Sequence, residues 1–359
     1  MRLLPRAAHA FGLTCGLAGG LLASAAESAF MNLGWDTFSP PSATIQSDSP
    51  VKLVDFEEFT VEPACESTAC DELCADPFCS TWYASAGAIF LQRSRPTTSA
   101  IATPPTGTPG VLINGSDFLF DWGYGPDVTI GKRLQNGLLV EARYFNSQSS
   151  DARFLIPAVT TFLTAGSGVT ILGGGSLDGF YSTTLNSGEF NVHKQVGDGG
   201  LTVLGGFRWI EVDDTLRVNI ATPVTFTQWH ESNRMFGGQL GLNMAFCSVG
   251  NPLQFNGFVK GGVYANNADN QFTSNIVGGT RSQETEAAFV GELGFSASCQ
   301  ITERLALKGG YQVLWLDNVA LASDAAANTV QAPGGTSSPP STDGRVWYNG
   351  ATVGFDYVW

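Results

Sequence analysis

Four cysteines lie close together in the sequence, and their spacing could serve either metal binding or disulfide formation. They follow the pattern C-x4-C-x3-C-x4-C at Cys65, Cys70, Cys74 and Cys79. Structural zinc sites usually supply their ligands in C-x2-C pairs, which this pattern lacks. In an oxidising compartment such cysteines form disulfides by default. We therefore favour two disulfides over a metal, and free or intermolecular thiols are a further alternative. Four cysteines can form two disulfides in three ways, and the sequence does not select one of them.

Two later cysteines, Cys247 and Cys299, each stand where an expected strand enters a short turn. If those turns belong to adjacent hairpins of one sheet, the two side chains come within disulfide reach. The sequence therefore predicts a disulfide at this rim of the sheet, and two separate buried thiols are the alternative.

Acid–base catalysis could use His230, which shares an expected loop with Asp213 and Asp214. A histidine beside an aspartate can form a catalytic dyad, but no flanking motif accompanies this one. A histidine next to a glutamate, here Glu231, is usually just solvated in a loop. The chain has no serine-hydrolase elbow, phosphate loop or dinucleotide motif. We predict a protein that is not an enzyme and has no cofactor or metal.

The first 26 residues have the order of a secretory signal peptide. Arg2 and Arg6 precede an apolar run over residues 10–22, and small residues follow up to Ala26. The run is shorter than the roughly 20 residues that a spanning helix needs. The sequence therefore predicts export, with cleavage after Ala25 or Ala26.

Residues 27–80 contain eleven acidic residues against one lysine and show little periodicity. Such composition is typical of an extended, irregular segment. We expect a periplasmic arm that carries the four clustered cysteines and caps or plugs the domain that follows. The net charge of −14 and the absence of basic clusters argue against nucleic-acid binding.

The composition and alternation of residues 81–359 predict a series of β-strands. The chain has 43 glycines and only 14% charged residues, where about 25% is average. Apolar and polar residues alternate in stretches of roughly the 9 to 11 residues that a tilted membrane strand needs. Ten such stretches lie at residues 82–91, 118–134, 138–145, 188–196, 201–212, 235–246, 254–265, 287–298, 305–316 and 347–359.

The connections between these stretches alternate between short and long. The short ones fall at residues 135–137, 197–200, 248–252 and 300–303. Outer-membrane barrels have short periplasmic turns and long external loops. The sequence therefore predicts an all-β fold: a closed antiparallel up-and-down transmembrane β-barrel of ten strands, with both ends in the periplasm. An extra hairpin within residues 157–175 would raise the number to twelve.

The two faces of these stretches suit lipid outside and a polar lumen inside. Outward positions are apolar, with aromatic residues towards the strand ends, as in the girdles of membrane barrels. Charged side chains in a dry core are costly unless they are paired, whereas a polar lumen accommodates them. The predicted lumen-lining residues are Glu141, Arg143, Arg208, Gln239, Lys260, Glu292, Lys308 and Asp356.

The final strand presents alternate apolar residues and ends on an indole. Its outward residues are Val353, Phe355, Tyr357 and Trp359. We expect them to meet lipid and to form the signal that barrel-insertion machinery reads. Pairing of this strand with residues 82–91 would leave no exposed edge.

Four segments resemble a known family. They are WYASAGAIFLQRSRP (82–96), LGGFRWIEVDD (204–214), NRMFGGQLGLNM (233–244) and WYNGATVGFDYVW (347–359). They are similar to strands of the β-barrel porin family of planctomycete-type outer-membrane proteins. The resemblance covers most of residues 81–359, except about 150–185. It implies a barrel in the cell outer membrane, in contact with lipid, that passes small solutes.

Two functions therefore stay open. One is a porin-like passive channel for small solutes, which the resemblance favours. The other is a non-conducting structural or adhesive barrel at the cell surface. Barrels of eight strands are filled by side chains, whereas 16 to 18 strands leave an aqueous channel, so ten strands favour the second.

Overall fold

The computed structural model describes residues 81–96, 99–103, 112–134, 137–164, 170–197, 200–220, 224–247, 253–332, 335–338 and 341–359. The expected signal peptide and the acidic segment with its four cysteines lie outside these residues. Within them, no helix is both long and apolar enough to cross a membrane.

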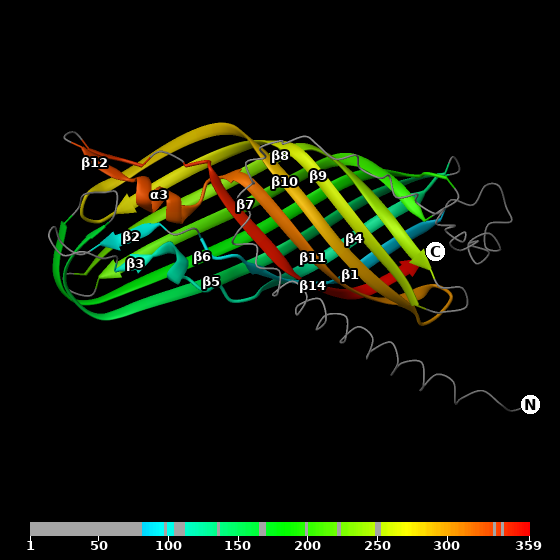
Figure 1. The fold of residues 1–359 in the computed structure, drawn as a ribbon, viewed down its shortest axis with the longest axis horizontal. Helices are drawn as coiled ribbons and strands as arrows, with labels where there is room; N and C mark the ends of the chain where they lie inside the picture. Colours follow the sequence, from blue (N-terminus) through cyan, green and yellow to red (C-terminus); the bar gives the residue numbers. More distant parts are fainter. Residues whose placement is uncertain are drawn as a thin grey trace, which may run out of the picture.

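Ten antiparallel strands close into a ring (Figure 1). In order around the ring they are β1 (Trp82–Arg93), β4 (Gly123–Arg133), β5 (Leu138–Thr164), β6 (Thr170–Gln195), β7 (Leu201–Ile220), β8 (Thr225–Cys247), β9 (Leu253–Ser274), β10 (Gly278–Gln300), β11 (Leu305–Val319) and β14 (Gly344–Val358). The predicted closed up-and-down barrel is confirmed.

The ring closes between its first and last strands. β1 and β14 pair in continuous register from Tyr83 opposite Val358 to Arg93 opposite Tyr348. At the end of the seam, the backbones of Trp82 and Trp359 exchange two hydrogen bonds of 3.0 Å, and their indole rings stack. We call this end of the barrel the terminal end and the opposite end the loop end.

An apolar band surrounds the outside of the ring at the terminal end. Its exposed side chains include Phe207, Leu240 and Val263. Aromatic residues border the band on both sides. Trp82, Tyr357 and Trp359 lie at the terminal end, and Trp209, Phe236, Phe289, Trp315 and Trp347 lie towards the loop end. This is the pattern of a surface that faces lipid between two aromatic girdles.

Six neighbouring strands are much longer than the band requires. β5 to β10 have 20 to 27 residues, whereas β1, β4, β11 and β14 have 11 to 15. The expected long loops between these six strands are therefore largely strand, because their alternating residues continue the ladder beyond the band. The alternative of an extra hairpin within residues 157–175 is not what the described residues form: they extend β5 to Thr164 and begin β6 at Thr170, two strands already counted in the ring.

Two connections fold back into the loop end of the barrel (Figure 1). The connection from β1 to β4 contributes β2 (Ala100–Thr103), β3 (Ile113–Asn114) and a 3-10 turn (Gly115–Asp117). The connection from β11 to β14 contributes α3 (Ala322–Asn328), β12 (Val330–Ala332) and β13 (Gly335–Ser337). We call residues 320–329 the plug.

The strand predicted over residues 118–134 begins at Gly123 in the structure, five residues later than predicted. Phe118 and Phe120 are buried, and both rings meet Tyr181 edge-on, at centroid distances of 5.3 and 5.1 Å. Burial of these rings inside the barrel takes residues 118–122 out of the ladder, and β4 starts at Gly123.

Candidate functional site in the barrel interior

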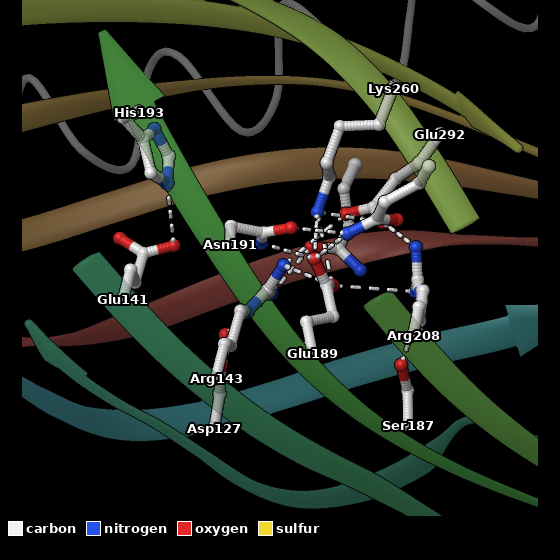
Figure 2. Close-up of polar contacts among 12 residues, drawn as sticks. Asp127, Glu141, Arg143, Ser187, Glu189, Asn191, His193, Arg208, Lys260 and Glu292 are labelled. Carbon is white, nitrogen blue, oxygen red and sulfur yellow. Dashed lines mark hydrogen bonds and ion pairs between the residues drawn. The ribbon is translucent and has the colours of Figure 1, made fainter. Parts of the chain in front are cut away.

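A layer of six charged side chains crosses the barrel interior (Figure 2). It lies at the level of the apolar band, because the exposed Leu293 of that band directly follows Glu292. Each side chain comes from a different strand. The charged layer consists of Asp127, Arg143, Glu189, Arg208, Lys260 and Glu292. It holds three cations and three carboxylates, so its formal charges cancel.

The ion pairs of the charged layer span the full width of the ring. Arg143 on β5 lies 3.2 Å from Glu292 on β10, and these strands are on opposite sides of a ten-stranded ring. Glu292 also meets Arg208 at 2.5 Å and Lys260 at 3.1 Å. Lys260 in turn lies 2.9 Å from Glu189. The two central carboxylates are therefore shared among cations from several walls.

Neutral polar side chains add hydrogen bonds to this layer. The Arg208 Nε donates to Ser187 at 2.9 Å, and an Arg143 amino group donates to the Gln312 amide oxygen at 2.9 Å. The Gln239 amide donates to Glu189 at 2.9 Å. Buried ions are tolerated only when pairs and hydrogen bonds replace the lost water. Most polar atoms of the charged layer meet this requirement, and the Arg208 Nη2, which lacks a hydrogen bond among the described residues, lies 3.6 Å from Glu189.

An apolar layer follows on the loop side of the charged layer. It is made of inward residues of all the ring strands except β4, together with Leu321 of the plug. Its larger members are Ile89, Leu91, Phe145, Leu185, Ile210, Val212, Met235, Tyr264, Val290, Leu314, Leu316, Val346 and Tyr348. Because these side chains exclude water, a second seal lies directly behind the first.

The plug is held in the loop end by side chains that project inward from the long strands. The Asp214 carboxylate accepts from the Ala322 backbone N–H at 3.0 Å, and the Tyr181 hydroxyl accepts from that of Ser323 at 3.1 Å. The Asn233 side chain bonds both the N–H and the carbonyl of Ala320. These contacts satisfy backbone groups that lie away from water.

The far side of the plug is anchored by an indole. The Trp229 Nε1 donates to the Thr329 hydroxyl at 2.8 Å, and that hydroxyl also contacts the Ala325 carbonyl at 2.7 Å. Buried faces of α3 pack with the aromatic rings from the β1–β4 connection in one apolar cluster. The plug is therefore part of the folded core of the loop end.

Two acidic groups in the loop end have very different surroundings. Asp214 pairs with Arg93 at 2.5 Å. Glu231 lies beyond the girdle at Trp209 and accepts a hydrogen bond from the Asn270 amide on one oxygen, whereas its other oxygen has no hydrogen-bond partner among the described residues. Burial raises the pKa of Glu231 to about 9, aided by nearby carboxylates. Glu231 is therefore protonated at neutral pH.

On the terminal side of the charged layer the interior is open and polar. A cavity of about 460 Å³ there has the charged layer as its roof. We call it the vestibule. Its walls include Ser85, Thr129, Asn243, Asn256 and Thr352. Glycines at inward positions, such as Gly87 and Gly354, widen it.

Several predicted lumen-lining residues meet in the vestibule. Glu141 accepts a hydrogen bond from the Tyr83 hydroxyl and lies 3.5 Å from the His193 Nε2. Lys308 lies 3.8 Å from Asp356. Of the eight predicted residues, these last two and Glu141 border the vestibule, while Arg143, Arg208, Gln239, Lys260 and Glu292 belong to or contact the charged layer.

The residues considered for catalysis are not brought together. His230 bonds the Thr215 hydroxyl at 2.8 Å. Asp214 is buried on the inner face and paired with Arg93, whereas neighbouring outward positions carry His230 and Asp213. No interaction between His230 and either aspartate is found among the described residues.

β8 carries Cys247 and β10 carries Cys299, and both strands are neighbours of β9. Cys247 lies opposite Gln254 of β9, and Cys299 lies opposite the adjacent residue Leu253. Their disulfide stays a prediction. Phe355, Tyr357 and Trp359 are outward and half exposed, as is Val353, which agrees with a lipid-facing position, and their role in insertion also stays a prediction.

Two members of the charged layer, Glu189 and Asp127, were not predicted. Glu189 stands at the same parity as Asn191 and His193 along β6, so strict alternation would have found it. Asp127 directly follows Gly125 and Pro126 in β4. Because neither residue shows which face of the strand is apolar, the alternation signal is weak there.

No protein-family profile matches the sequence, and no curated protein matches it significantly. Among solved structures, it is similar to the outer-membrane protease OmpT from Escherichia coli, with TM-score 0.46, 9% identity, and coverage of 79% of this chain and 97% of that one. It is also similar to the toluene transporter TbuX from Ralstonia pickettii (TM-score 0.31, 11% identity, 78% and 88% coverage) and to the attachment invasion locus protein Ail of Yersinia pestis (0.25, 8%, 77% and 99%). Similarities this low carry no argument about function, and the planctomycete-type resemblance stays a prediction.

Proposed function

We propose that this chain is an outer-membrane barrel whose lumen is closed to solutes, acting as a structural or adhesive barrel at the cell surface. The charged layer carries this proposal, because an Arg143–Glu292 pair of 3.2 Å crosses between opposite walls. An ion that moved through would have to break fully buried pairs. The apolar layer and the plug close the same path again.

The apolar band and its aromatic girdles support placement in lipid. In this orientation the terminal end faces the periplasm and the loop end faces outward. A band of about 25 Å takes up roughly 9 to 11 residues of a tilted strand. The remaining length of β5 to β10 then projects as a wall above the membrane, suited to contact with other molecules.

The outward face of that wall carries cross-strand ion pairs on successive hairpins. They join Arg153 to Asp178, Arg234 to Glu211, and Arg281 to Asp269. Such exposed polar pairs are compatible with water and incompatible with lipid, which supports the position of the membrane boundary at the girdle.

The second candidate is the porin-like channel that passes small solutes, and the polar vestibule is the observation that favours it. Planar-bilayer recording of the whole purified chain separates the two. We expect no unitary conductance steps from protein that shows a heat-dependent shift in gel mobility. Stable steps from such protein would overturn the closed barrel.

Two variants test whether the absence of conductance steps is caused by the charged layer and the apolar layer. Deletion of residues 320–340 with a short Gly-Ser linker should stay silent, because the charged layer is intact. The same deletion combined with Arg143→Ser, Lys260→Ser and Glu292→Ser in the charged layer, and with Phe145→Ser, Met235→Ser and Tyr264→Ser in the apolar layer, in a folded barrel, should conduct. If the plug deletion alone conducts, the charged layer is not the principal seal.

Export by residues 1–26, disulfides among the cysteines, and recognition of the final strand by insertion machinery complete this proposal. The seam supports the last point, since Trp359 pairs with the first strand through its backbone. Deletion of Trp359 should lower the yield of folded barrel in the outer membrane, with Val358 retained.

A further inference from the structure

We infer that the vestibule is a binding site for a small, neutral, polyhydroxylated solute that enters from the terminal end. This goes beyond the closed barrel, because it concerns a dead-end pocket and requires no passage. A volume of about 460 Å³ lies within the range of roughly 300 to 1,000 Å³ that small-molecule sites occupy.

The walls present hydrogen-bonding atoms that the protein itself does not satisfy. Asn243 Oδ1 and Gln312 Nε2 have neither a hydrogen bond nor an ion pair among the described residues, and His193 Nε2 and Asp356 Oδ1 have only long ion-pair contacts, at 3.5 Å from Glu141 and 3.8 Å from Lys308. His193 and Gln312 are 5% and 3% exposed. Buried polar atoms are rarely left unmet, so Asn243 and Gln312 mark the positions where we expect a solute hydroxyl to bind.

The chemistry of these atoms is mixed. Gln312 offers an amide N–H, whereas Asn243 offers a carbonyl oxygen. Hydroxyls of Ser85, Thr129 and Thr352 line the same space. A solute hydroxyl can both donate and accept, so a polyol matches this mixture better than a group that only donates or only accepts.

The charges that face the vestibule are compensated within the protein. Lys308 lies 3.8 Å from Asp356, and Glu141 accepts a hydrogen bond from the Tyr83 hydroxyl and lies 3.5 Å from the His193 Nε2. The roof is neutral as a unit. Arg133, the remaining cation that lines the cavity, is an exposed residue at the end of β4. A strongly charged solute would therefore meet no dedicated counter-ion.

Apolar faces complete the fit. Phe258 and Tyr83 line opposite parts of the cavity wall, on β9 and β1. The C–H faces of a sugar ring can pack on aromatic rings while its hydroxyls bond the polar wall. Glycine at inward positions keeps this space open: a Cβ at Gly131 would come within 2.1 Å of the Tyr83 ring.

The test is saturation-transfer NMR on the whole chain in detergent micelles, with D-glucose and sucrose as probes and glutamate and lysine as charged comparators. We expect saturable binding of at least one sugar. Asn243→Leu keeps the side-chain volume, and the Asn243 Oδ1 makes no hydrogen bond to the charged layer among the described residues, so the substitution should weaken binding at least fivefold without disturbing that layer. Leu242→Ala, on the lipid face of the same strand, is the matched control.

Three results would overturn the inference: no saturable sugar binding by folded protein, preferential binding of glutamate or lysine, or equal affinity in the wild type and Asn243→Leu. Gel mobility with and without heating verifies folding for each variant. Bilayer recordings on the same samples keep this outcome separate from the closed barrel, since a silent barrel can still bind sugar and a conducting one can fail to.

Discussion

The two halves of the barrel interior are filled in opposite ways although the same strands line both. Towards the terminal end the interior is a polar, open vestibule beneath a charged layer. Towards the loop end it is dry and holds the plug. The difference shows that a closed sheet alone does not decide whether a lumen is open, because the side chains and returning loops do.

The halves also differ in how polar groups are satisfied. In the charged layer, side chains bond one another across the ring. In the loop end, side chains such as Asn233 bond the backbone of an inserted segment. The first arrangement seals by ion pairing, and the second by folding a loop into the space.

The largest effect should come from breaking the charged layer. Arg208→Met leaves Glu292 and Glu189 short of a cation, and an unpaired buried charge costs about 3–5 kcal/mol. Urea unfolding of the barrel in micelles measures the loss. Arg208→Met with Glu292→Gln restores neutrality and should recover most of it.

Arg281→Met is the control for this experiment, since its pair with Asp269 is on the outer surface. Its effect should be small, because exposed ion pairs are screened by water and salt. If Arg208→Met is no more damaging than Arg281→Met, the charged layer is not a buried unit.

The next effect concerns pH in the loop end. The pKa of Glu231 is raised to about 9 in the folded barrel by burial, against about 4.3 for a free side chain. Wild-type stability should therefore fall as pH rises from about 4.5 to 9, because only the unfolded state gains from losing the proton. Glu231→Gln removes this dependence, so the variant should be more heat-stable than wild type at pH 8 and similar at pH 4.5.

Thermal shifts at several pH values, read from gel mobility, measure this difference. Glu284→Gln, at an exposed position on β10, is the matched control. A stability gain from Glu231→Gln that is equal at pH 4.5 and pH 8 would contradict the assigned cause.

A smaller effect is expected at the anchor of the plug. Trp229→Phe keeps an aromatic ring but loses the hydrogen bond to Thr329, a change of about 1 kcal/mol. Amide exchange in residues 322–328 should become faster, while exchange around the charged layer stays the same. Trp347→Phe, on the outer girdle, should leave the plug unaffected. Equal acceleration in both halves would mean that they do not open separately.

The smallest effect should appear on the projecting wall. Arginine 281 hydrogen-bonds Asp269 and lowers the pKa of that carboxyl. Arg281→Ala should therefore change stability only slightly, and the change should fade as salt is raised. A large loss that persists in high salt would show that the wall is held together by its surface pairs.

Much of the barrel could be predicted from local pattern. Alternation placed Arg208, Lys260 and Glu292 on inner faces because side chains alternate strictly along a strand. The same rule placed Phe355 outside. It missed the length of β5, since the Ser- and Thr-rich residues beyond Phe145 have a weak apolar signal and a shift in register between Ser147 and Ser150.

The closure of the interior could not be predicted in this way. The sequence shows that Arg143 and Glu292 face inward, but they are 149 residues apart, and only the curvature of the ring sets the distance across it. The position of the plug depends equally on distant partners, as Trp229 and Thr329 show.

By itself, the sequence determined where the ring strands lie within the membrane band, their inner and outer faces and the seam between the first and last strands, because these follow from a two-residue period and the lengths of the connections. It left open the choice between ten and twelve strands and missed the full length of β5 to β10. Only the tertiary structure decided that the lumen is crossed by ion pairs and that residues 320–329 fold inside. Those outcomes depend on distances between opposite walls, which no local pattern encodes.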